Sequence, residues 1–186
     1  MTRYRYAFYF VFFTLFFAGK IKAQNLDIVN AASEVTFRIS NLGVNVSGKF
    51  TGFSGEIKYY PGNVEQSTFV GSVNAETVDT GINLRDRHLR NEDYFDVEKF
   101  PVIRFVSESS ALTETNKGLT VTGTLTIKGI SKKVVIPLDV KETSQGYTFV
   151  GGLKINRRDF GVGGGSLTLS DIVYISFKIQ TSRQSK

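Results

Sequence analysis

Residues 119–140 read LTVTGTLTIKGISKKVVIPLDV, and this stretch decides the fold. Over residues 119–127, apolar side chains alternate with threonines, which is the period of a strand that buries one face. Residues 128–131 then supply a short turn that contains glycine, and residues 134–140 return to the same alternation. Two alternating runs joined by such a turn predict an antiparallel β-hairpin.

The same two-residue period recurs through most of the chain outside this hairpin. Turn signals such as Pro61-Gly62-Asn63 separate the runs at intervals of roughly ten residues. No linker, internal repeat or low-complexity segment divides them, so we expect one all-β domain of about eight antiparallel strands. The further runs are residues 35–39, 44–50, 53–59, 69–75, 147–155 and 173–179.

The positions of glycine and phenylalanine favour an extended barrel over a two-sheet sandwich. Gly48, Gly71, Gly123 and Gly151 fall on the apolar faces of their runs, where a sharply bent sheet needs a missing side chain. Phenylalanines recur on the apolar faces of successive runs. A small barrel can be filled by such side chains, whereas a slightly larger one encloses an elongated apolar cavity. The pattern alone leaves both interiors open.

The first 23 residues form a separate segment. Arg3 and Arg5 precede a Phe-rich apolar run over residues 8–18, and Ala23 ends the segment. Because this run is too short for a stable membrane span, we expect a signal peptide over residues 1–23 and a mature domain over residues 24–186. An uncleaved N-terminal anchor is the alternative. The signal peptide predicts a periplasmic or secreted protein whose mature chain has no stable membrane span.

The mature chain carries little net charge and few reactive side chains. Without the four basic residues of the leader, 19 Lys and Arg face 17 Asp and Glu, a net charge of +2. No clustered basic face is evident, so we expect no nucleic-acid partner. Zero cysteines and a single histidine exclude thiolate chemistry and a histidine-rich metal site. We expect no catalytic residue, no metal site and no cofactor.

One polar segment interrupts the strand patterns. Residues 83–95 read NLRDRHLRNEDYF and include the only histidine, His88, before Phe100-Pro101 restarts a strand. This composition predicts a short helical insert that covers the mouth of the barrel. His88 is then either a packing residue or a hydrogen-bonding group at the polar end of an apolar cavity. No G-x-S-x-G elbow accompanies it, which disfavours a Ser/His/acid triad.

Three blocks of this sequence resemble the YceI-like proteins. Residues 85–105, RDRHLRNEDYFDVEKFPVIRF, are similar to that family's pattern R-D-x-H-L-R-x-x-D-F-F-D-x-x-x-Y-P-x-I-x-F, with Tyr94 and Phe100 as mild departures. Residues 123–132, GTLTIKGISK, and residues 156–161, NRRDFG, resemble two further blocks of the family. The resemblance covers essentially all of the mature chain in the expected order.

The resemblance implies an extended, lipocalin-like barrel with a helix closing one end. Members of the family are typically exported, some bind polyisoprenoid chains or isoprenoid quinones inside the barrel, and no general enzymatic activity is attached to them. A Phe-lined tube suits such a ligand, because each buried CH₂ contributes about 0.8 kcal/mol. We therefore expect a protein that holds a long apolar isoprenoid-type lipid, a polyprenyl chain or a quinone, for transport or storage. A homodimer is compatible with the sequence.

Two other functions remain as alternatives. A structural or stress-related envelope protein would have a filled barrel, and an enzyme acting on a barrel-bound lipid would use His88. For the lipid carrier, His88 and Arg90 are the predicted polar ligand-binding residues at the mouth. The strand alternation predicts the inward-facing ligand-binding residues Phe37, Ile39, Val46, Phe50, Phe69, Val73, Phe105, Leu125, Ile136, Phe149, Ile175 and Phe177.

Overall fold

The structure is a computed structural model that describes residues 24–29, 32–114 and 118–184. The expected signal peptide over residues 1–23 lies outside these ranges. The described chain contains one α-helix, α1 (Asn83–Arg90), and short 3-10 helices, of which η2 (Val64–Gln66), η3 (Ala75–Thr77) and η4 (Arg157–Phe160) connect strands. The strands are β1 (Gln24–Ile28), β2 (Glu34–Asn41), β3 (Val44–Phe50), β4 (Ser54–Tyr59), β5 (Thr68–Asn74), β6 (Val102–Leu112), β7 (Leu119–Ile127), β8 (Ile130–Glu142), β9 (Tyr147–Asn156) and β10 (Leu169–Arg183).

These strands close into an antiparallel barrel, as the sequence predicted. Each strand from β4 to β10 pairs with the next one along the chain. β1 joins the two edges, because it pairs with β4 on one side and with the C-terminal end of β10 on the other. Leu26 of β1 lies opposite both Ile57 and Arg183. Eight strands therefore surround the interior.

Two of the eight strands are interrupted, which gives the ten labelled strands. Residues 181–183 of β10 pair with β1, and the part of β10 further upstream pairs with β2. β1 and β2 thus follow one another along the same edge of β10. In the same way, β4 lies beside β1 and β3 lies beside β2. β3 meets the segment after β5 through a bridge between Lys49 and Asp79.

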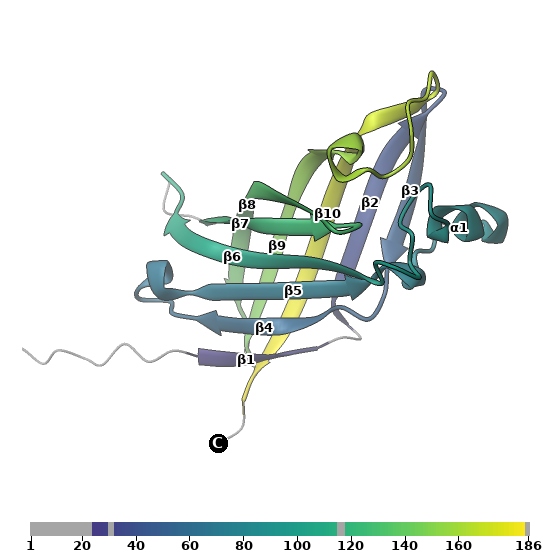
Figure 1. Ribbon diagram of the computed structural model, residues 1–186. Coiled ribbons are helices and arrows are strands. Elements are labelled where there is room, and N and C mark those ends of the chain that lie inside the picture. Colours follow the sequence, from purple (N-terminus) through teal and green to yellow (C-terminus); the bar gives the residue numbers. More distant parts are fainter. Residues whose placement is uncertain (1–23, 30–31, 115–117, 185–186) are drawn as a thin grey trace, which may run out of the picture.

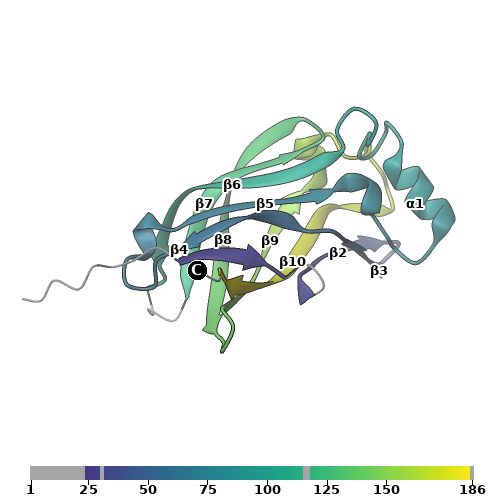
Figure 2. The ribbon, with the colours of Figure 1, turned by 90° about the horizontal axis from the view of Figure 1, so that it is seen from below.

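The barrel is elongated, and the helix lies at one end. Figure 1 shows β4, β5, β6 and β7 running across the direction of β9, β10 and β2. Figure 2, viewed from below, shows α1 at the end of the molecule where β2 and β3 lie.

The predicted hairpin is confirmed, and the helical insert is shorter than predicted. β7 and β8 pair in register from Leu119 to Ile127, and the turn between them is only Lys128 and Gly129, both with positive φ. Such a two-residue turn matches the twist of the flanking strands. α1 ends at Arg90, because the backbone N–H groups of Tyr94 and Asp96 both bond to the carbonyl of Asn91 and form a turn there.

Glycines on the inner face let phenylalanine rings lie close against the barrel wall. A Cβ atom added to Gly48 would lie 2.4 Å from the ring of Phe37, its partner across the β2–β3 pair. A Cβ atom on Gly151 would lie 2.8 Å from the ring of Phe177 across the β9–β10 pair. The rings therefore occupy space above the glycines. Two more inner-face glycines lie under phenylalanine rings in the same way: Gly71 under Phe53 and Gly123 under Phe105.

The interior is filled at the end opposite α1. The rings of Tyr59, Tyr147 and Phe149 pack with centroids 4.9 to 6.2 Å apart. Leu26 and Leu119 complete the same buried cluster. Phe149 is 1% exposed. This packed end closes the barrel, whereas the half toward α1 encloses open space.

Candidate ligand cavity

An apolar cavity of about 490 Å³ occupies the barrel interior next to the packed end. Its volume lies within the range of small-molecule binding sites, roughly 300–1,000 Å³. Phe149 and Ile179 line it and also belong to the packed cluster. Thr80, His88 and Leu89 line it from the helical end. The cavity therefore runs from the packed end to the α1 end, and it contradicts the solid interior that a filled barrel requires.

All of the predicted inward-facing residues lie around this cavity. They come from strands on every side of the barrel, because the two-residue period places alternate side chains on the inner face. Whether they contact a ligand stays a prediction. The residues are Phe37, Ile39, Val46, Phe50, Phe69, Val73, Phe105, Leu125, Ile136, Phe149, Ile175 and Phe177.

Helix α1 is held across the mouth by buried polar contacts. Asp86, which is 5% exposed, accepts hydrogen bonds at Oδ1 from the backbone N–H of Thr80 at 2.9 Å and from the Thr80 hydroxyl at 2.5 Å. Arg85 donates from Nε to Thr80 Oγ1 at 2.7 Å and from Nη2 to the Thr80 carbonyl at 2.8 Å. These contacts fix the first turn of the helix, and they leave Arg85 lining the cavity.

The structure corrects the placement of Arg90 at the mouth. Its Nε donates to the carbonyl of Glu76 at 2.7 Å, and its Nη2 donates to the carbonyl of Val78 at 2.9 Å. Arg90 is not among the residues that line the cavity. Two helical positions separate it from His88, which is more than half a turn, so the two side chains leave the helix on different faces. Arg90 ties α1 to the segment after β5.

His88 lines the cavity at the α1 end, and whether it contacts a ligand stays a prediction. Its ring centroid is 4.9 Å from that of Tyr94, at an interplanar angle of 60°. The side chain is exposed and lines the cavity. In the part of the chain that the structure describes, its ring makes no hydrogen bond to a serine or to an acidic side chain.

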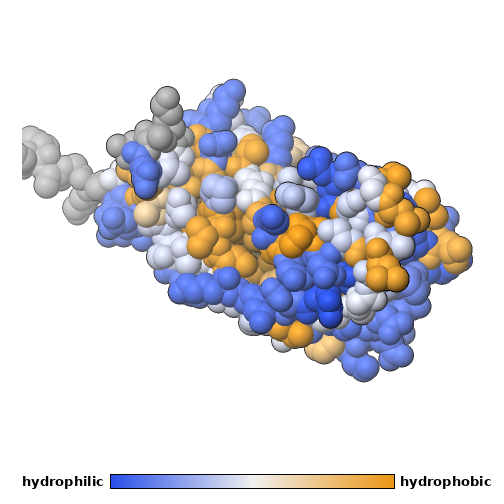
Figure 3. All heavy atoms as spheres, turned by 90° about the horizontal axis from the view of Figure 1, so that it is seen from above, coloured by the Kyte–Doolittle hydropathy of each residue, from blue (hydrophilic) through white to orange (hydrophobic). Residues whose placement is uncertain are grey.

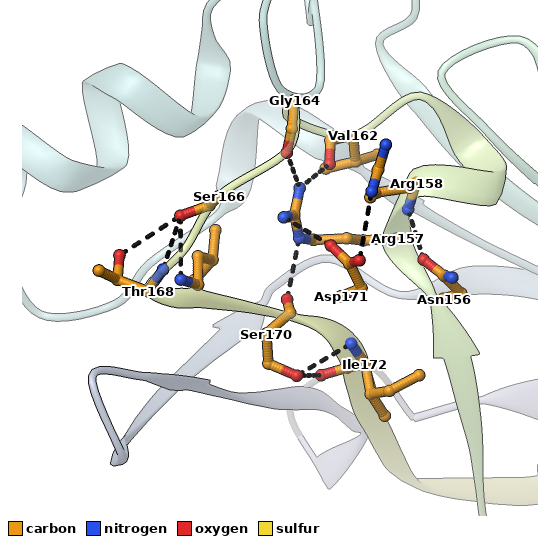
Figure 4. Close-up of polar contacts among 11 residues, drawn as sticks. Asn156, Arg157, Arg158, Val162, Gly164, Ser166, Thr168, Ser170, Asp171 and Ile172 are labelled. Atoms are coloured by element: carbon orange, nitrogen blue, oxygen red, sulfur yellow. Dashed lines mark hydrogen bonds and ion pairs between the residues drawn. The ribbon is translucent and has the colours of Figure 1, made fainter.

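Arg157 holds the glycine-rich segment over residues 161–165, and Figure 4 shows its contacts. This side chain is only 4% exposed. Its Nη1 donates to the carbonyls of Val162 and Gly164 at 2.8 and 3.0 Å, and its Nε donates to the carbonyl of Ser170 at 2.9 Å. Its Nη2 pairs with Asp171 Oδ1 at 2.9 Å. The buried charge is thus neutralised, and the loop carbonyls are satisfied, as a buried cation requires.

One polar atom at the cavity wall lacks a partner. Asn41 Oδ1 is the one buried side-chain oxygen or nitrogen without a hydrogen bond among the described residues. Asn41 ends β2 and lines the cavity together with Ser166 and Thr168. A buried polar atom of this kind is costly unless something donates to it. It marks a position where a ligand hydroxyl could donate a hydrogen bond.

Sequence reasoning missed several residues of this site. Asn41, Thr80 and Arg157 gave no signal by periodicity, because two lie at strand ends or turns and the third lies in a 3-10 helix. The run of charges in residues 157–159, directly before a glycine-rich segment, is the signal that could have pointed to Arg157. Phe53 and Ile57 follow the same alternation and also line the cavity, as does Phe95 in the turn after α1.

No helix within the described ranges has the length and apolar character needed to cross a membrane. The same ranges contain no group of three or more His, Asp or Glu side chains placed to hold a metal ion. The lining residues make the cavity an apolar chamber with a few polar groups at its mouth.

Comparison with known proteins gives relatives over most of the chain. A UPF0312 protein of Shewanella denitrificans is 33% identical over 144 residues, which are 74% of this chain and 75% of that protein. A UPF0312 protein of Vibrio cholerae is 29% identical over 153 residues, which are 78% and 80% of the two chains. The matched regions extend over most of the barrel domain.

Solved structures share the fold. The crystal structure of BcnA from Burkholderia cenocepacia is 30% identical, with a TM-score of 0.79 over 82% of this chain and 98% of that one. A YceI protein of Campylobacter jejuni is 27% identical, with a TM-score of 0.69 over 77% and 87%. A domain from Saccharophagus degradans, described as polyisoprenoid binding, is 15% identical, with a TM-score of 0.66 over 88% and 100%. The YceI-like domain itself matches residues 26–181, and the chain belongs to the YceI-like family.

Proposed function

We propose that the protein holds one long, apolar, isoprenoid-type lipid in its barrel, for transport or storage. The observation that carries this proposal is the open cavity of about 490 Å³, lined by aromatic and aliphatic side chains from all sides of the barrel. A flexible hydrocarbon gains about 0.8 kcal/mol for each buried CH₂. Affinity can therefore come from chain burial, with little demand for a particular headgroup.

The polar groups at the mouth fit the polar end of such a lipid. Arg85 and His88 offer N–H donors, and the unpartnered Asn41 Oδ1 offers an acceptor, at the end where the apolar lining stops. A quinone carbonyl or a polyprenol hydroxyl would find a complementary group among these three. The polyisoprenoid binding described for the Saccharophagus degradans domain supports the proposal through the shared fold.

We further propose that the protein acts outside the cytoplasm after residues 1–23 are removed. The basic start, the Phe-rich run and Ala23 support this location. N-terminal sequencing of the protein from fractionated cells tests it. A chain beginning near Gln24 in the extracytoplasmic fraction is expected, and a chain that retains Met1 or Thr2 would contradict the proposal.

The experiment that tests ligand binding is extraction of the natively purified protein into organic solvent, followed by mass spectrometry. An isoprenoid lipid is expected at close to one molecule per barrel. Purified protein that yields no such lipid, and that takes up neither polyprenol nor isoprenoid quinone when mixed with them, would overturn the proposal.

His88→Ala separates a carrier from an enzyme. In a carrier the chain supplies most of the binding, and one hydrogen bond nets about 0.5–1.5 kcal/mol, so lipid retention falls by about tenfold at most. In an enzyme that uses its single histidine as acid or base, turnover falls by a factor of about 10²–10⁴. Incubation of both proteins with polyprenol, followed by mass spectrometry, distinguishes the two. Conversion of the lipid by the original protein but not by the variant would refute the carrier.

A further inference from the structure

The most exposed large apolar side chains gather at the mouth of the cavity. Among the described residues, the four with the highest exposed fractions are Leu167 at 106%, Leu42 at 75%, Leu84 at 71% and Val44 at 67%. All four lie on three segments that also line the cavity: residues 41–46, 80–90 and 161–169. We call these three segments the rim.

The rim is continuous, although its segments are far apart in the sequence. The backbone N–H of Leu42 donates to the carbonyl of Thr168 at 2.9 Å, which joins the β2–β3 turn to the glycine-rich loop. The N–H of Gly163 donates to the carbonyl of Asp93 at 2.8 Å, which joins that loop to the segment after α1. The bridge between Lys49 and Asp79 joins β3 to the start of the helical insert. Figure 3 shows apolar patches at the right-hand end of the molecule, the end that carries α1 in Figures 1 and 2, and a further apolar group over the middle of this face.

Leu42 is held in a backbone conformation that disfavours leucine. It has φ 51 in the two-residue turn before Gly43, whose φ is 77. Asn or Gly normally occupies this position, because a left-handed conformation crowds the Cβ atom of other residues. The chain thus places a leucine at the tip of the hairpin, three-quarters exposed, at a cost to its own stability. Folding gives no reason for that side chain, which points to a role in binding.

The rim presents one exposed arginine, Arg87, to an anionic surface. Arg85 and Arg90 are bonded to Thr80 and to backbone carbonyls, and the single acidic residue of the three segments, Asp86, is 5% exposed and bonded to Thr80. Glu92 and Asp93, just outside the rim, are exposed. The nearby Asp79 is paired with Lys49 at 3.6 Å. Separate aliphatic side chains that protrude beside an arginine fit a fluid lipid interface, into which each can insert independently.

We propose that the rim docks on an anionic lipid surface and places the cavity mouth against the membrane. Leu42, Leu84 and Leu167 insert among the acyl chains, and Arg87 approaches the headgroups. Docking itself needs no cavity ligand. Docking would let a lipid pass between membrane and barrel without exposure to water, and this use of docking rests on the proposed function.

The test compares vesicle binding by the processed protein and by the triple variant Leu42→Asn, Leu84→Gln, Leu167→Ser. Vesicles of phosphatidylcholine mixed with phosphatidylglycerol are pelleted or floated, and the bound fraction is measured. Loss of each inserted leucine is expected to weaken partitioning by roughly tenfold. The matched control is Leu112→Asn, Val135→Thr, Val150→Thr, which removes exposed apolar side chains at 52%, 56% and 43% exposure outside the rim. The control is expected to bind like the original protein.

The thermal midpoint is a second measurement, which distinguishes a loss of docking from a loss of folding. Leu42→Asn alone is expected to raise the thermal midpoint by roughly 2–4 °C, because it relieves the left-handed leucine, while it lowers vesicle binding. Equal vesicle binding by the rim and control variants would overturn docking. So would a protein that ignores these vesicles and forms rim-dependent dimers in sedimentation. If the barrel holds lipid but the protein does not bind vesicles, only docking is rejected. If the protein binds vesicles but its barrel is empty, only the lipid-carrier proposal is rejected.

Discussion

At the scale of single residues, the segment RDRHLR divides between holding the helix and lining the mouth. Asp86 and Arg90 bond to Thr80 and to backbone carbonyls after β5, and neither needs a ligand to explain its contacts. His88 is exposed beside Tyr94. A motif that looks functional in sequence is thus largely a device for docking α1, and only part of it is available to a ligand.

Phe149→Ala should lower stability far more than a change at the next residue. Phe149 is 1% exposed and packs against Tyr59, Phe69 and Tyr147. Truncation of such a side chain costs about 3–5 kcal/mol, whereas Val150→Ala, at 43% exposure, should stay within about 0.5 kcal/mol. Urea unfolding measures both. Equal losses would mean that β9 has the opposite register. Thr148 is an unsuitable control, because it is itself 9% exposed.

Tyr59 should make stability fall at alkaline pH. Burial raises the pKa of the Tyr59 phenol above 10.0, with smaller contributions from Tyr147 and Glu142. The unfolded chain therefore ionises first, so the stabilisation is complete below about pH 10 and is lost as the pH rises through the higher pKa of the folded state. The slope reaches at most about 1.4 kcal/mol per pH unit. Unfolding of Tyr59→Phe should show a shallower alkaline decline than unfolding of the original protein.

At the scale of elements, the open interior of the barrel depends on interrupted strands and on glycines as well as on apolar side chains. β1 and β2 are separate strands along one edge of β10, and β4 and β3 are separate strands beside them. The glycines opposite Phe37 and Phe177 leave room for rings at the wall. The Arg157 contacts fix the loop at the same end. These features together leave an open interior where continuous, fully substituted strands would fill it.

Gly151→Ala tests this use of glycine within a strand. The new methyl group would lie 2.5 Å from Leu138 Cδ2, 2.8 Å from the carbonyl oxygen of Pro137 and 2.8 Å from the ring of Phe177. Overpacking of this kind costs about 1–3 kcal/mol. Because the ring of Phe177 lines the cavity, its displacement should also lower polyprenol uptake. Gly164→Ala, which meets nothing within 4 Å, is the control. Unchanged stability and uptake for Gly151→Ala would show that the wall yields more easily than its packing implies.

At the scale of the whole molecule, removal of a bound lipid should destabilise the barrel. A ligand at 100 times its Kd adds about 2.7 kcal/mol, which corresponds to roughly 5–10 °C in the thermal midpoint for a domain of this size. Protein stripped by detergent exchange should therefore melt lower than protein reloaded with polyprenol. Calorimetry of the two forms measures the difference. Identical midpoints for the stripped and the reloaded protein would argue against lipid in the cavity.

Much of the architecture could be predicted from the sequence, because a period of two identifies one face of every strand. It located the twelve apolar side chains at the cavity wall and the β7–β8 hairpin. It missed β1, whose five residues become a strand only by pairing with two distant edges. It also misplaced Arg90, since its partners are backbone carbonyls of another segment. Contacts between segments far apart in sequence leave no periodic trace.

The packed aromatic end, formed by Tyr59, Tyr147 and Phe149, closes one end of the barrel. A chain that enters such a barrel tail first stops at a fixed depth, and any remaining length stays outside. Affinity would then depend on chain length only up to a limit. Homologous lipids long enough to reach the packed end would bury the same number of carbons and bind with the same strength. Shorter homologues would fall off in affinity step by step with each missing unit.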